Sequence, residues 1–579
     1  MNDVIQPAND LSIIRGHPLS EEPGLGPLTL PGMLQASALR HPEREALAMH
    51  QPDGSVTRWS YAELWERTVE VARALVACGV GKGSRVGVLM TNRPEWIAAV
   101  FGTSLAGGVA VALSTFSTES ELEFLLKSAD VSVLLFEPSV LRKNFQDMLL
   151  RLEPQIGAAE PGRIASRQLP FLRHVAKLGE QGGCGAIETW PQFLSRGAAV
   201  ESWLVDATAS TVKPAEPALL LFSSGTTGRP KGVISAHRAI CIQCWRWARF
   251  YGFGPDVRAW SPNGFFWSGN FALGLGPILA VGGCIVIQQT FDTTEAVKLL
   301  ESERVTFAYA WPHQWAQLEA APNWDAADLS NLRYFDTERQ LRRLHRTIHT
   351  DWREPLASYG NTEAFTIVTG VPANLPIEET RGHNGAALAG CIIKIIDPQS
   401  DRVLPRGESG EIAIKGPTLM LGYVGVPLDE TLDEEGFFRT GDGGYIDDLG
   451  RLVFQGRLND IIKTGGANVS PIEVDNLLAT CPGVKLCKTV GVPHETLGEI
   501  IISCVAAQPA SELDEEQVRA FLRAHLASYK VPRRVFFVSE TELDFTGSAK
   551  IKADGVRALA GKRLRKEANE AATAGPDPR

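Results

Sequence analysis

Cysteine is scarce in this sequence and follows no spacing typical of a disulfide framework. The nine cysteines among 579 residues are an odd number, which favours free thiols in a reducing compartment, and we expect a cytoplasmic protein. Cys241 and Cys244 form one CxxC pair, and no second pair accompanies it. Core packing of these two thiols is therefore favoured over a metal or redox site.

A surplus of basic charge and an apolar N-terminal signal are also missing. The formal net charge of −10 gives no indication of nucleic-acid binding, and the polar, Pro-rich N-terminus lacks the core of a secretory signal. The uncharged run 96–118 is long enough for a membrane span, but glycines and hydroxyl residues interrupt it. We expect instead a helix to about Leu105, a turn and a buried strand over 109–113, with no transmembrane segment.

The length and the alternation of predicted elements indicate an α/β protein of at least two domains. A chain of 579 residues is too long for one ordinary core. A helix is predicted from Ser60 to Cys78 and a strand at 86–90, and the alternation continues to about residue 136, which favours a mostly parallel sheet. Residues 1–27 are expected to form a loose arm and residues 155–192 an irregular surface excursion.

What the sequence does contain is a central stretch suited to holding a polyphosphate. The apolar run 218–222 predicts a buried strand, and a helix is predicted from about His237 through Trp247. Between them stands Ser223-Ser224-Gly225-Thr226-Thr227-Gly228-Arg229-Pro230-Lys231-Gly232. Glycines let backbone N–H groups approach an anion, the hydroxyls add donors and Lys231 adds a cation. Because Gly232 follows Lys231, this is not a Walker A loop. The alternative is a surface turn of chance composition.

This stretch resembles the phosphate loop of the adenylate-forming superfamily, which includes acyl-CoA synthetases, peptide-synthetase adenylation domains and beetle luciferases. The resemblance covers roughly residues 30 to 556. It implies an enzyme that joins a carboxylate to AMP, releases pyrophosphate and passes the acyl group to a thiol, using ATP, Mg²⁺ and CoA. It also implies that Thr226 is catalytic and contacts Mg²⁺. The other implied nucleotide-binding residues of the loop are Ser223, Ser224, Gly225, Thr227, Gly228 and Lys231.

A second motif, Ser358-Tyr359-Gly360-Asn361-Thr362-Glu363, follows in the order the family has. A tyrosine beside a glycine can lie against a flat base, and a glutamate offers the hard oxygen that Mg²⁺ prefers. The resemblance implies that Tyr359 stacks on adenine, with Gly360 and Asn361 beside it in the nucleotide site. It also implies that Thr362 contacts phosphate and that Glu363 is a catalytic Mg²⁺ ligand. Taken alone, the motif could be an ordinary strand-to-loop junction.

Two further motifs come later in the chain. An acidic residue after a glycine turn can hold two ribose hydroxyls, and the resemblance implies this role for Asp442 and, with it, Arg457. It places a hinge at Asn459, where Asp or Lys is usual in the family. It also implies that Gly465 and Gly466 line the path of CoA. A Thr-Gly-Asp turn is common by itself, so position in the chain gives this motif its weight.

The last implied catalytic residue is Lys550, which would place a cation where negative charge develops during adenylation. Ala549 and Asp544 depart from the family motif around it, and a plain surface lysine is the alternative. A second departure is the run 334–340, which replaces a Gly-Gly-Ala-Pro-like turn beside the adenine and acyl sites.

The resemblance places the acid pocket at Phe266, Trp267, Gly269 and Asn270. Thirteen tryptophans are a high count, and four lie in the middle of the chain: Trp260, Trp267, Trp311 and Trp315. A wide pocket for an aromatic or polycyclic acid would suit them, but they could equally be core residues.

These motifs predict an AMP-forming acyl-CoA synthetase. The expected fold is a large N-terminal domain of α/β sheets with a distorted β-barrel, residues 1–457, followed by a small mobile α+β domain, residues 458–579. The expected substrates are a hydrophobic carboxylic acid (fatty, aryl or polycyclic), ATP and CoA, and a homodimer is left open. Two alternatives are an acyl-AMP ligase that serves a carrier protein and a non-catalytic relative that binds nucleotide or acyl groups.

Overall fold

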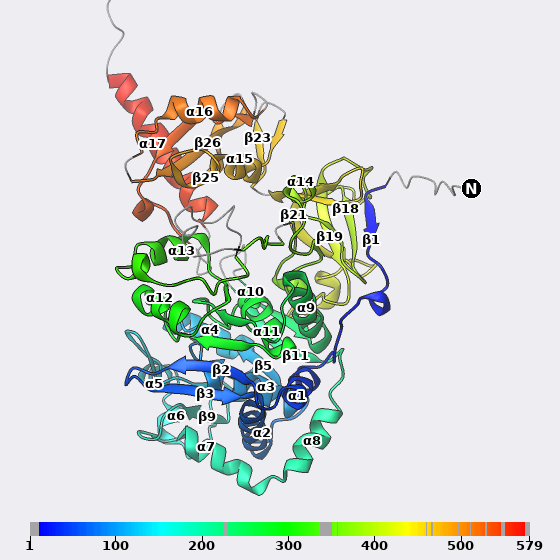
Figure 1. Ribbon diagram of the computed structural model, residues 1–579, viewed down its shortest axis with the longest axis vertical. Coiled ribbons are helices and arrows are strands. Elements are labelled where there is room, and N and C mark those ends of the chain that lie inside the picture. Colours follow the sequence, from blue (N-terminus) through cyan, green and yellow to red (C-terminus); the bar gives the residue numbers. More distant parts are fainter. Residues whose placement is uncertain are drawn as a thin grey trace, which may run out of the picture. The chain divides into compact units, whose positions relative to one another are not determined.

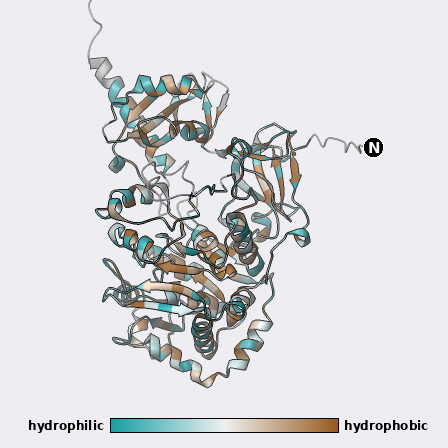
Figure 2. Cartoon of the chain, in the orientation of Figure 1, coloured by the Kyte–Doolittle hydropathy of each residue, from teal (hydrophilic) through white to brown (hydrophobic). Residues whose placement is uncertain are grey.

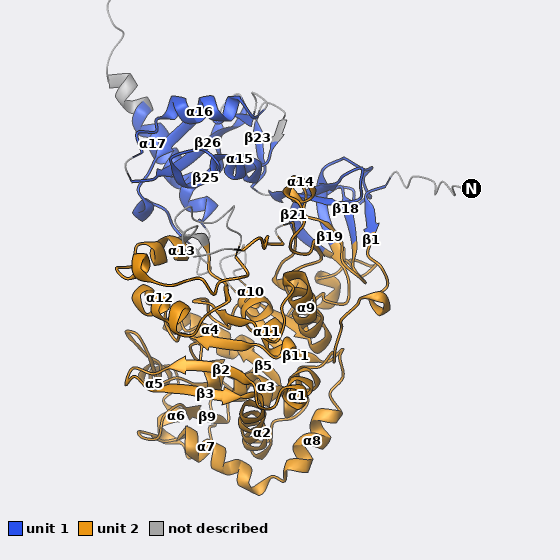
Figure 3. Ribbon diagram, viewed as in Figure 1, with its two compact units in different colours: residues 1–14, 393–413, 439–579 blue, residues 15–392, 414–438 orange. Residues whose placement is uncertain are grey.

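The computed structural model divides into two compact units, coloured separately in Figure 3. The large unit comprises residues 15–392 and 414–438, and the small unit residues 1–14, 393–413 and 439–579. The structure describes the following residues: 11–223, 230–335, 350–355, 357–458, 460–464, 467–494, 497–509, 511–526, 530–545 and 551–573.

An eight-stranded sheet forms the centre of the large unit (Figure 1). Its strands, in spatial order, are β10 (Ile187–Thr189), β9 (His174–Lys177), β6 (Val133–Phe136), β4 (Arg85–Leu89), β5 (Val109–Ala112), β11 (Pro217–Ser223), β12 (Lys231–Ala236) and β20 (Gly422–Tyr423). The pairs from β10 to β11 are parallel, and β12 is antiparallel to both of its neighbours. The carboxyl ends of the parallel strands therefore meet at one edge, where open α/β sheets bind their ligands.

A second sheet of the large unit is also mostly parallel. Its order is β15 (Phe307–Ala308), β13 (Arg258–Trp260), β14 (Cys284–Ile287), β2 (Glu45–His50) and β3 (Val56–Ser60), and only β3 is antiparallel to its neighbour. Two short antiparallel strand pairs accompany the sheets, β7 (Ser139–Val140) with β8 (Lys143–Asn144) and β16 (Thr369–Gly370) with β17 (Ala386–Ala387).

The helices of the large unit begin where the sequence provides caps. Ser60 and Glu63 form a capping box at the start of α2, and Thr118 and Glu121 do the same for α4. The helices are α1 (Leu30–Arg40), α2 (Tyr61–Ala77), α3 (Pro94–Leu105), α4 (Glu119–Ser128), α5 (Phe145–Leu152), α6 (Gln155–Ala158), α7 (Trp190–Arg196), α8 (Ser202–Ser210), α9 (His237–Tyr251), α10 (Ser268–Asn270), α11 (Gly276–Val281), α12 (Thr293–Ser302), α13 (Pro312–Glu319) and α14 (Ile377–Thr380). The uncharged run 96–118 is helix α3, a turn and strand β5, as predicted.

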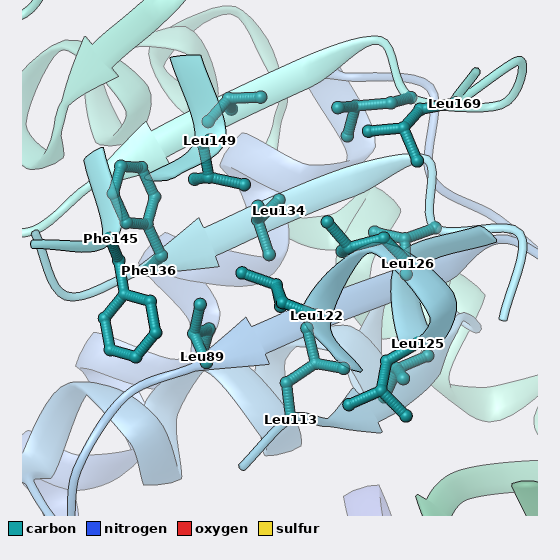
Figure 4. Close-up of a cluster of buried hydrophobic side chains, with 14 of the residues drawn as sticks. Leu89, Leu113, Leu122, Leu125, Leu126, Leu134, Phe136, Phe145, Leu149 and Leu169 are labelled. Atoms are coloured by element: carbon teal, nitrogen blue, oxygen red, sulfur yellow. The ribbon is translucent and has the colours of Figure 1, made fainter. Parts of the chain in front are cut away.

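Hydrophobic residues concentrate along the strands of the sheets, whose faces are covered by helices (Figure 2). One large cluster joins the sheet to α4 and α5. Figure 4 shows Leu89 of β4, Leu113 after β5 and Leu122 of α4 within it, and all three side chains are fully buried. Burial of each such side chain contributes roughly 1.5–3 kcal/mol relative to exposure, so this cluster fixes the loops that leave the sheet at its carboxyl edge.

Two sequence predictions about irregular segments were wrong. Residues 155–192 contribute α6, β9, β10 and the start of α7, and both strands join the central sheet. These strands have only four and three residues, and the glycines between them obscure the apolar pattern.

Within the predicted loose arm, residues 11–27 contain a strand and a buried ion pair. Strand β1 (Ile13–Arg15) joins a sheet, and the buried carboxylate of Glu22 pairs with Arg246 of α9 at 2.8 Å and Arg249 at 3.0 Å. A buried arginine needs such a partner. The sequence did not show that the arm would supply it.

The small unit contains two sheets. The first has the order β1, β18 (Ile392–Ile396), β19 (Gly410–Lys415), β21 (Phe438–Ile446) and β22 (Leu452–Arg457). The second has the order β24 (Ala467–Val469), β23 (Ile462–Thr464), β26 (Gly498–Ala507) and β25 (Val484–His494), with β27 (Arg534–Phe537) parallel to β26.

Helices α15 (Pro471–Leu478), α16 (Glu515–Arg523) and α17 (Ala553–Thr573) accompany the second sheet. The residues after 460 form two hydrophobic clusters, which give this part of the chain a core of its own. The boundary predicted near residue 458 remains a prediction, because the division into compact units groups segments 393–413 and 439–457 with the C-terminal part.

Candidate active site

The two ends of the predicted phosphate loop face each other at the carboxyl edge of the central sheet. Ser223 ends β11 and Lys231 begins β12, and the two residues are paired in the antiparallel register. The loop therefore joins two adjacent strands before α9 begins. Ser224, Gly225, Thr226, Thr227 and Gly228 lie outside the described residues.

Lys231 is linked to Glu363 through a tyrosine that the sequence reading did not single out. The ammonium of Lys231 lies 5.0 Å from the centre of the Tyr423 ring, and the Tyr423 hydroxyl donates to the Glu363 carboxylate at 2.7 Å. Tyr423 reaches this place because β20 pairs with β12. No sequence pattern indicated that pairing, which joins segments almost two hundred residues apart.

The loop from Tyr359 to Thr366 has a strained and tightly packed backbone. A Cβ atom on Gly360 would lie 1.7 Å from the carbonyl oxygen of Thr366, so only glycine fits there. Phe365 and Thr366 have φ angles of 47° and 105°, which residues other than glycine rarely adopt. Strain of this kind is concentrated at functional sites, where the surrounding structure must hold it in place.

Helix α9 supplies that support. The buried Gln243 amide donates to the carbonyl oxygens of Ala364 and Ile367 at 3.0 and 2.7 Å. The Trp247 indole donates to the Thr366 hydroxyl at 3.0 Å. Inside the loop, the Asn361 side chain accepts from the Ala364 N–H at 2.9 Å. Asn361 therefore shapes the loop through its side chain, while Tyr359 is buried at the start of it.

The acidic and polar groups of this loop suit a magnesium ion that is held mainly by phosphate. The Glu363 carboxylate is half-buried, and only one of its oxygens accepts from Tyr423. Within the described parts of the chain, no cluster of three metal-ligating side chains occurs. Mg²⁺ commonly takes one or two carboxylates plus substrate phosphates, so a single glutamate beside a phosphate loop fits this ion.

The predicted wall of the acid pocket packs against the same loop. The Ser268 hydroxyl lies 3.5 Å from the Thr362 hydroxyl, and the buried rings of Phe271 and Phe365 meet edge to face at 5.8 Å. Phe266 and Trp267 form an aromatic pair with centroids 5.3 Å apart. A Cβ on Gly269 would lie 3.8 Å from the Tyr309 hydroxyl, which places Tyr309 in this wall.

Asparagine side chains fix the backbone of this wall. Asn92, just after β4, donates to the Asn263 carbonyl at 2.7 Å and accepts from the Phe265 N–H at 2.8 Å. Asn270 also donates to the Asn263 carbonyl, at 2.5 Å. The short π-helix Phe271–Leu275 follows directly, and such turns are frequent at functional sites. Asn270 therefore acts on the shape of the wall.

The four middle tryptophans divide between core and wall. Trp260 and Trp315 are almost fully buried within one hydrophobic cluster. Trp267 and Trp311 are partly exposed, and Trp311 lies against Tyr309 with centroids 5.7 Å apart.

Cys241 and Cys244 are fully buried in α9, and burial raises the pKa of both thiols, so core packing is confirmed for this pair.

In the small unit, Asp442 and Arg457 face each other on β21 and β22. The buried Asp442 carboxylate pairs with the Arg457 guanidinium at 2.9 Å, while half of the Arg457 side chain is exposed. Arg457 also donates to the Thr440 carbonyl at 2.8 Å, and the Asp442 N–H donates to the Thr440 hydroxyl at 3.1 Å. Four predicted site residues lie outside the described residues: Asn459, Gly465, Gly466 and Lys550. The same is true of residues 336–340.

Comparison with known proteins identifies the family of this chain. The family of AMP-binding enzymes matches residues 34–424, and the C-terminal domain of AMP-binding enzymes matches residues 473–550. The chain therefore belongs to the AMP-binding enzyme family. As the resemblance implied, it is an adenylate-forming, AMP-forming acid–thiol ligase whose reaction uses ATP, Mg²⁺ and CoA.

Two curated relatives and one solved structure illustrate the likeness. The chain is 31% identical over 522 residues to the 3-[(3aS,4S,7aS)-7a-methyl-1,5-dioxo-octahydro-1H-inden-4-yl]propanoyl:CoA ligase of Mycobacterium tuberculosis, covering 88% of this chain and 95% of the relative. It is 31% identical over 510 residues to feruloyl-CoA synthase of an Amycolatopsis species, covering 86% and 94%.

ATP-bound MatB of Rhodopseudomonas palustris has the same fold, with a TM-score of 0.72 at 24% identity, covering 92% of this chain and 98% of that chain. None of the helices among the described residues has both the length and the hydrophobicity needed to cross a membrane.

Proposed function

We propose that the acid activated by this enzyme is apolar and carries a ring, as an aryl or polycyclic carboxylic acid does. The observation that carries this proposal is the aromatic wall of Phe266, Trp267 and Tyr309, which the Ser268–Thr362 contact places directly beside the loop of Glu363. Two relatives named for ring-bearing acids, an indenyl-propanoate derivative and ferulate, support the same substrate class.

The residues divide the proposed adenylation step among them. A carboxylate oxygen of the acid forms a bond to the α-phosphorus of ATP, and the bond from that phosphorus to the β-phosphate oxygen breaks, releasing pyrophosphate. Ser223, Lys231 and the loop between them hold the phosphates, and Glu363 holds Mg²⁺, which neutralises phosphate charge when bound. Tyr359 is the proposed adenine contact and Lys550 the proposed cation for the developing charge.

The second step would transfer the acyl group to CoA. The thiolate sulfur bonds to the acyl carbon, the bond to the AMP oxygen breaks, and AMP leaves. Asp442 and Arg457 are the proposed ribose ligands. Rotation about Asn459 and a CoA path along Gly465 and Gly466 remain part of the proposal.

The nine cysteines are free thiols, which supports a reducing compartment, and we place the enzyme in the cytoplasm.

A panel of acids tests this function. Short, straight-chain, aryl and polycyclic acids would each be supplied with ATP, Mg²⁺ and CoA, and both pyrophosphate and CoA thioester would be measured. The proposal expects thioester from ring-bearing acids at the highest kcat/KM. Thioester from straight-chain acids alone would contradict the substrate class. Pyrophosphate without thioester would point to a different acyl acceptor.

A further inference from the structure

A phenylalanine outside the residues discussed above is held at the rim of the aromatic wall. Phe116 follows β5, so it lies at the carboxyl edge of the central sheet, where β11 delivers the phosphate loop. Its side chain is 63% exposed, and its ring meets the buried Phe266 ring edge to face with centroids 6.0 Å apart. Phe266 in turn contacts Trp267, so Phe116 extends the aromatic wall toward solvent.

The loop that carries Phe116 is fixed in place, although the ring itself is exposed. The Lys143 ammonium donates to the carbonyl oxygens of Thr115, Phe116 and Ser117 at 3.4, 2.7 and 2.9 Å. The Phe116 N–H donates to the Ser114 hydroxyl at 3.1 Å. On either side of the loop, Leu113 and Leu122 are fully buried in the large cluster (Figure 4).

Singly exposed apolar side chains are common and need no explanation by themselves. Phe116 differs from them because a lysine holds three successive carbonyl groups of its loop and because its ring continues a wall that ends in buried aromatics. An aromatic ring presented in this way offers its face to another ring at little cost in conformational entropy, since its loop is already ordered.

We propose that Phe116 is a specificity-determining residue that covers the acid site and favours acids with a ring over straight-chain acids of equal carbon number. The inference rests on the proposed function. An additional aromatic contact is worth about 0.5–1.5 kcal/mol, so removing the Phe116 ring should lower kcat/KM for ring-bearing acids about two- to tenfold.

The test compares four proteins with two acids. Wild type, Phe116→Ala, Phe116→Leu and Phe171→Ala would each be assayed for pyrophosphate release with a naphthyl acid and a straight-chain acid of equal carbon number. Phe171 is the matched control, because it is 54% exposed and precedes β9, at the opposite edge of the same sheet.

Both Phe116 variants should lose the preference for the naphthyl acid. Phe116→Leu should keep the wild-type rate of pyrophosphate release with the straight-chain acid, because an apolar side chain still covers the site. The inference is overturned if the ratio of the rate with the naphthyl acid to the rate with the straight-chain acid is unchanged in Phe116→Ala. It is also overturned if this ratio changes equally in Phe171→Ala. The dissociation constants of both acids, measured by calorimetry on the same proteins, decide the question independently of turnover. If wild type releases no pyrophosphate with any acid, the proposed function fails, and the calorimetric ratio still tests Phe116.

Discussion

The two units each present one buried or half-buried carboxylate at a predicted nucleotide contact, and their surroundings differ. Glu363 of the large unit accepts a hydrogen bond from a neutral phenol, the Tyr423 hydroxyl, at 2.7 Å. Asp442 of the small unit is paired with the guanidinium of Arg457 at 2.9 Å. Among the described residues, the hydrogen-bonding partner of Glu363 is therefore neutral, whereas the partner of Asp442 is a cation.

This difference indicates which ligand each carboxylate can hold. A divalent cation binds best to a carboxylate that is not already paired with a cation, and among the described residues this fits Glu363 better than Asp442. A ribose hydroxyl is neutral and donates a hydrogen bond, so it can bind a carboxylate that an arginine already balances, and the arginine adds donors of its own. The local partners of Glu363 and Asp442 thus agree with a metal role for the first and a ribose role for the second.

The largest effect is expected from Glu363→Gln. Glutamine can still accept from Tyr423, but it removes the charge that would bind Mg²⁺. Pyrophosphate release should fall by at least about 100-fold, and half-saturation should require more Mg²⁺. The measurement is initial rate against Mg²⁺ concentration at saturating ATP. Asp442→Asn is the matched control and should leave the Mg²⁺ dependence unchanged. Equal Mg²⁺ dependence in both variants would remove the distinction between the two carboxylates.

The next effect concerns the backbone that carries Glu363. Gly360→Ala places a methyl group 1.7 Å from the Thr366 carbonyl oxygen, so the loop must move. A displacement of about 1 Å can cost about 100-fold in rate, and we expect a loss of that order in adenylation together with a lower melting temperature. Gly81→Ala is the control, because a Cβ there would meet nothing within 4 Å and Gly81 lies outside the predicted site. Wild-type activity in Gly360→Ala would show that the loop geometry is not required.

The large-unit helices and parallel strands between residues 60 and 113 could be predicted from the sequence, because their caps and apolar periods are local. The position of the Tyr359–Glu363 motif relative to the phosphate loop could not, because it depends on contacts of high sequence separation. Gln243 and Trp247 hold the loop from α9, and Tyr423 arrives through the pairing of β20 with β12. Such side chains look like ordinary helix and strand residues until the fold brings them together.

A smaller effect is expected from Asp442→Asn. Removing one charged hydrogen bond to a ribose hydroxyl should raise the KM for ATP about tenfold, since such bonds contribute about 1.5–3 kcal/mol and part of this is recovered by the amide. The variant should also discriminate less between ATP and its 2′- or 3′-deoxy analogues. Arg457 is half-exposed and can be solvated when unpaired. A KM that stays at the wild-type value for all of these nucleotides would exclude Asp442 from ribose binding.

The smallest effect should come from Tyr423→Phe, which removes the hydrogen bond to Glu363 and keeps the ring beside Lys231. A hydrogen bond to a charged group contributes about 1.5–3 kcal/mol. Water can replace the phenol at the half-buried Glu363 carboxylate and recover much of this, so adenylation should fall only about two- to tenfold. Tyr423→Leu removes the contact between the ring and Lys231 as well and should fall somewhat further, since a cation near an aromatic ring gains about 0.5–1 kcal/mol at exposed sites. Pyrophosphate release and its Mg²⁺ dependence would be measured for both variants.

If Tyr423→Phe instead matched the loss in Glu363→Gln, the phenol could not be a neutral support for a charged carboxylate. The hydroxyl would then itself contact the reacting phosphates, and the two carboxylates would differ less than their partners suggest. A small loss with unchanged Mg²⁺ dependence would show that the charge of Glu363, and not its hydrogen-bonding partner, holds the ion. That outcome would leave the arginine beside Asp442 as the feature that separates a ribose site from a metal site in this chain.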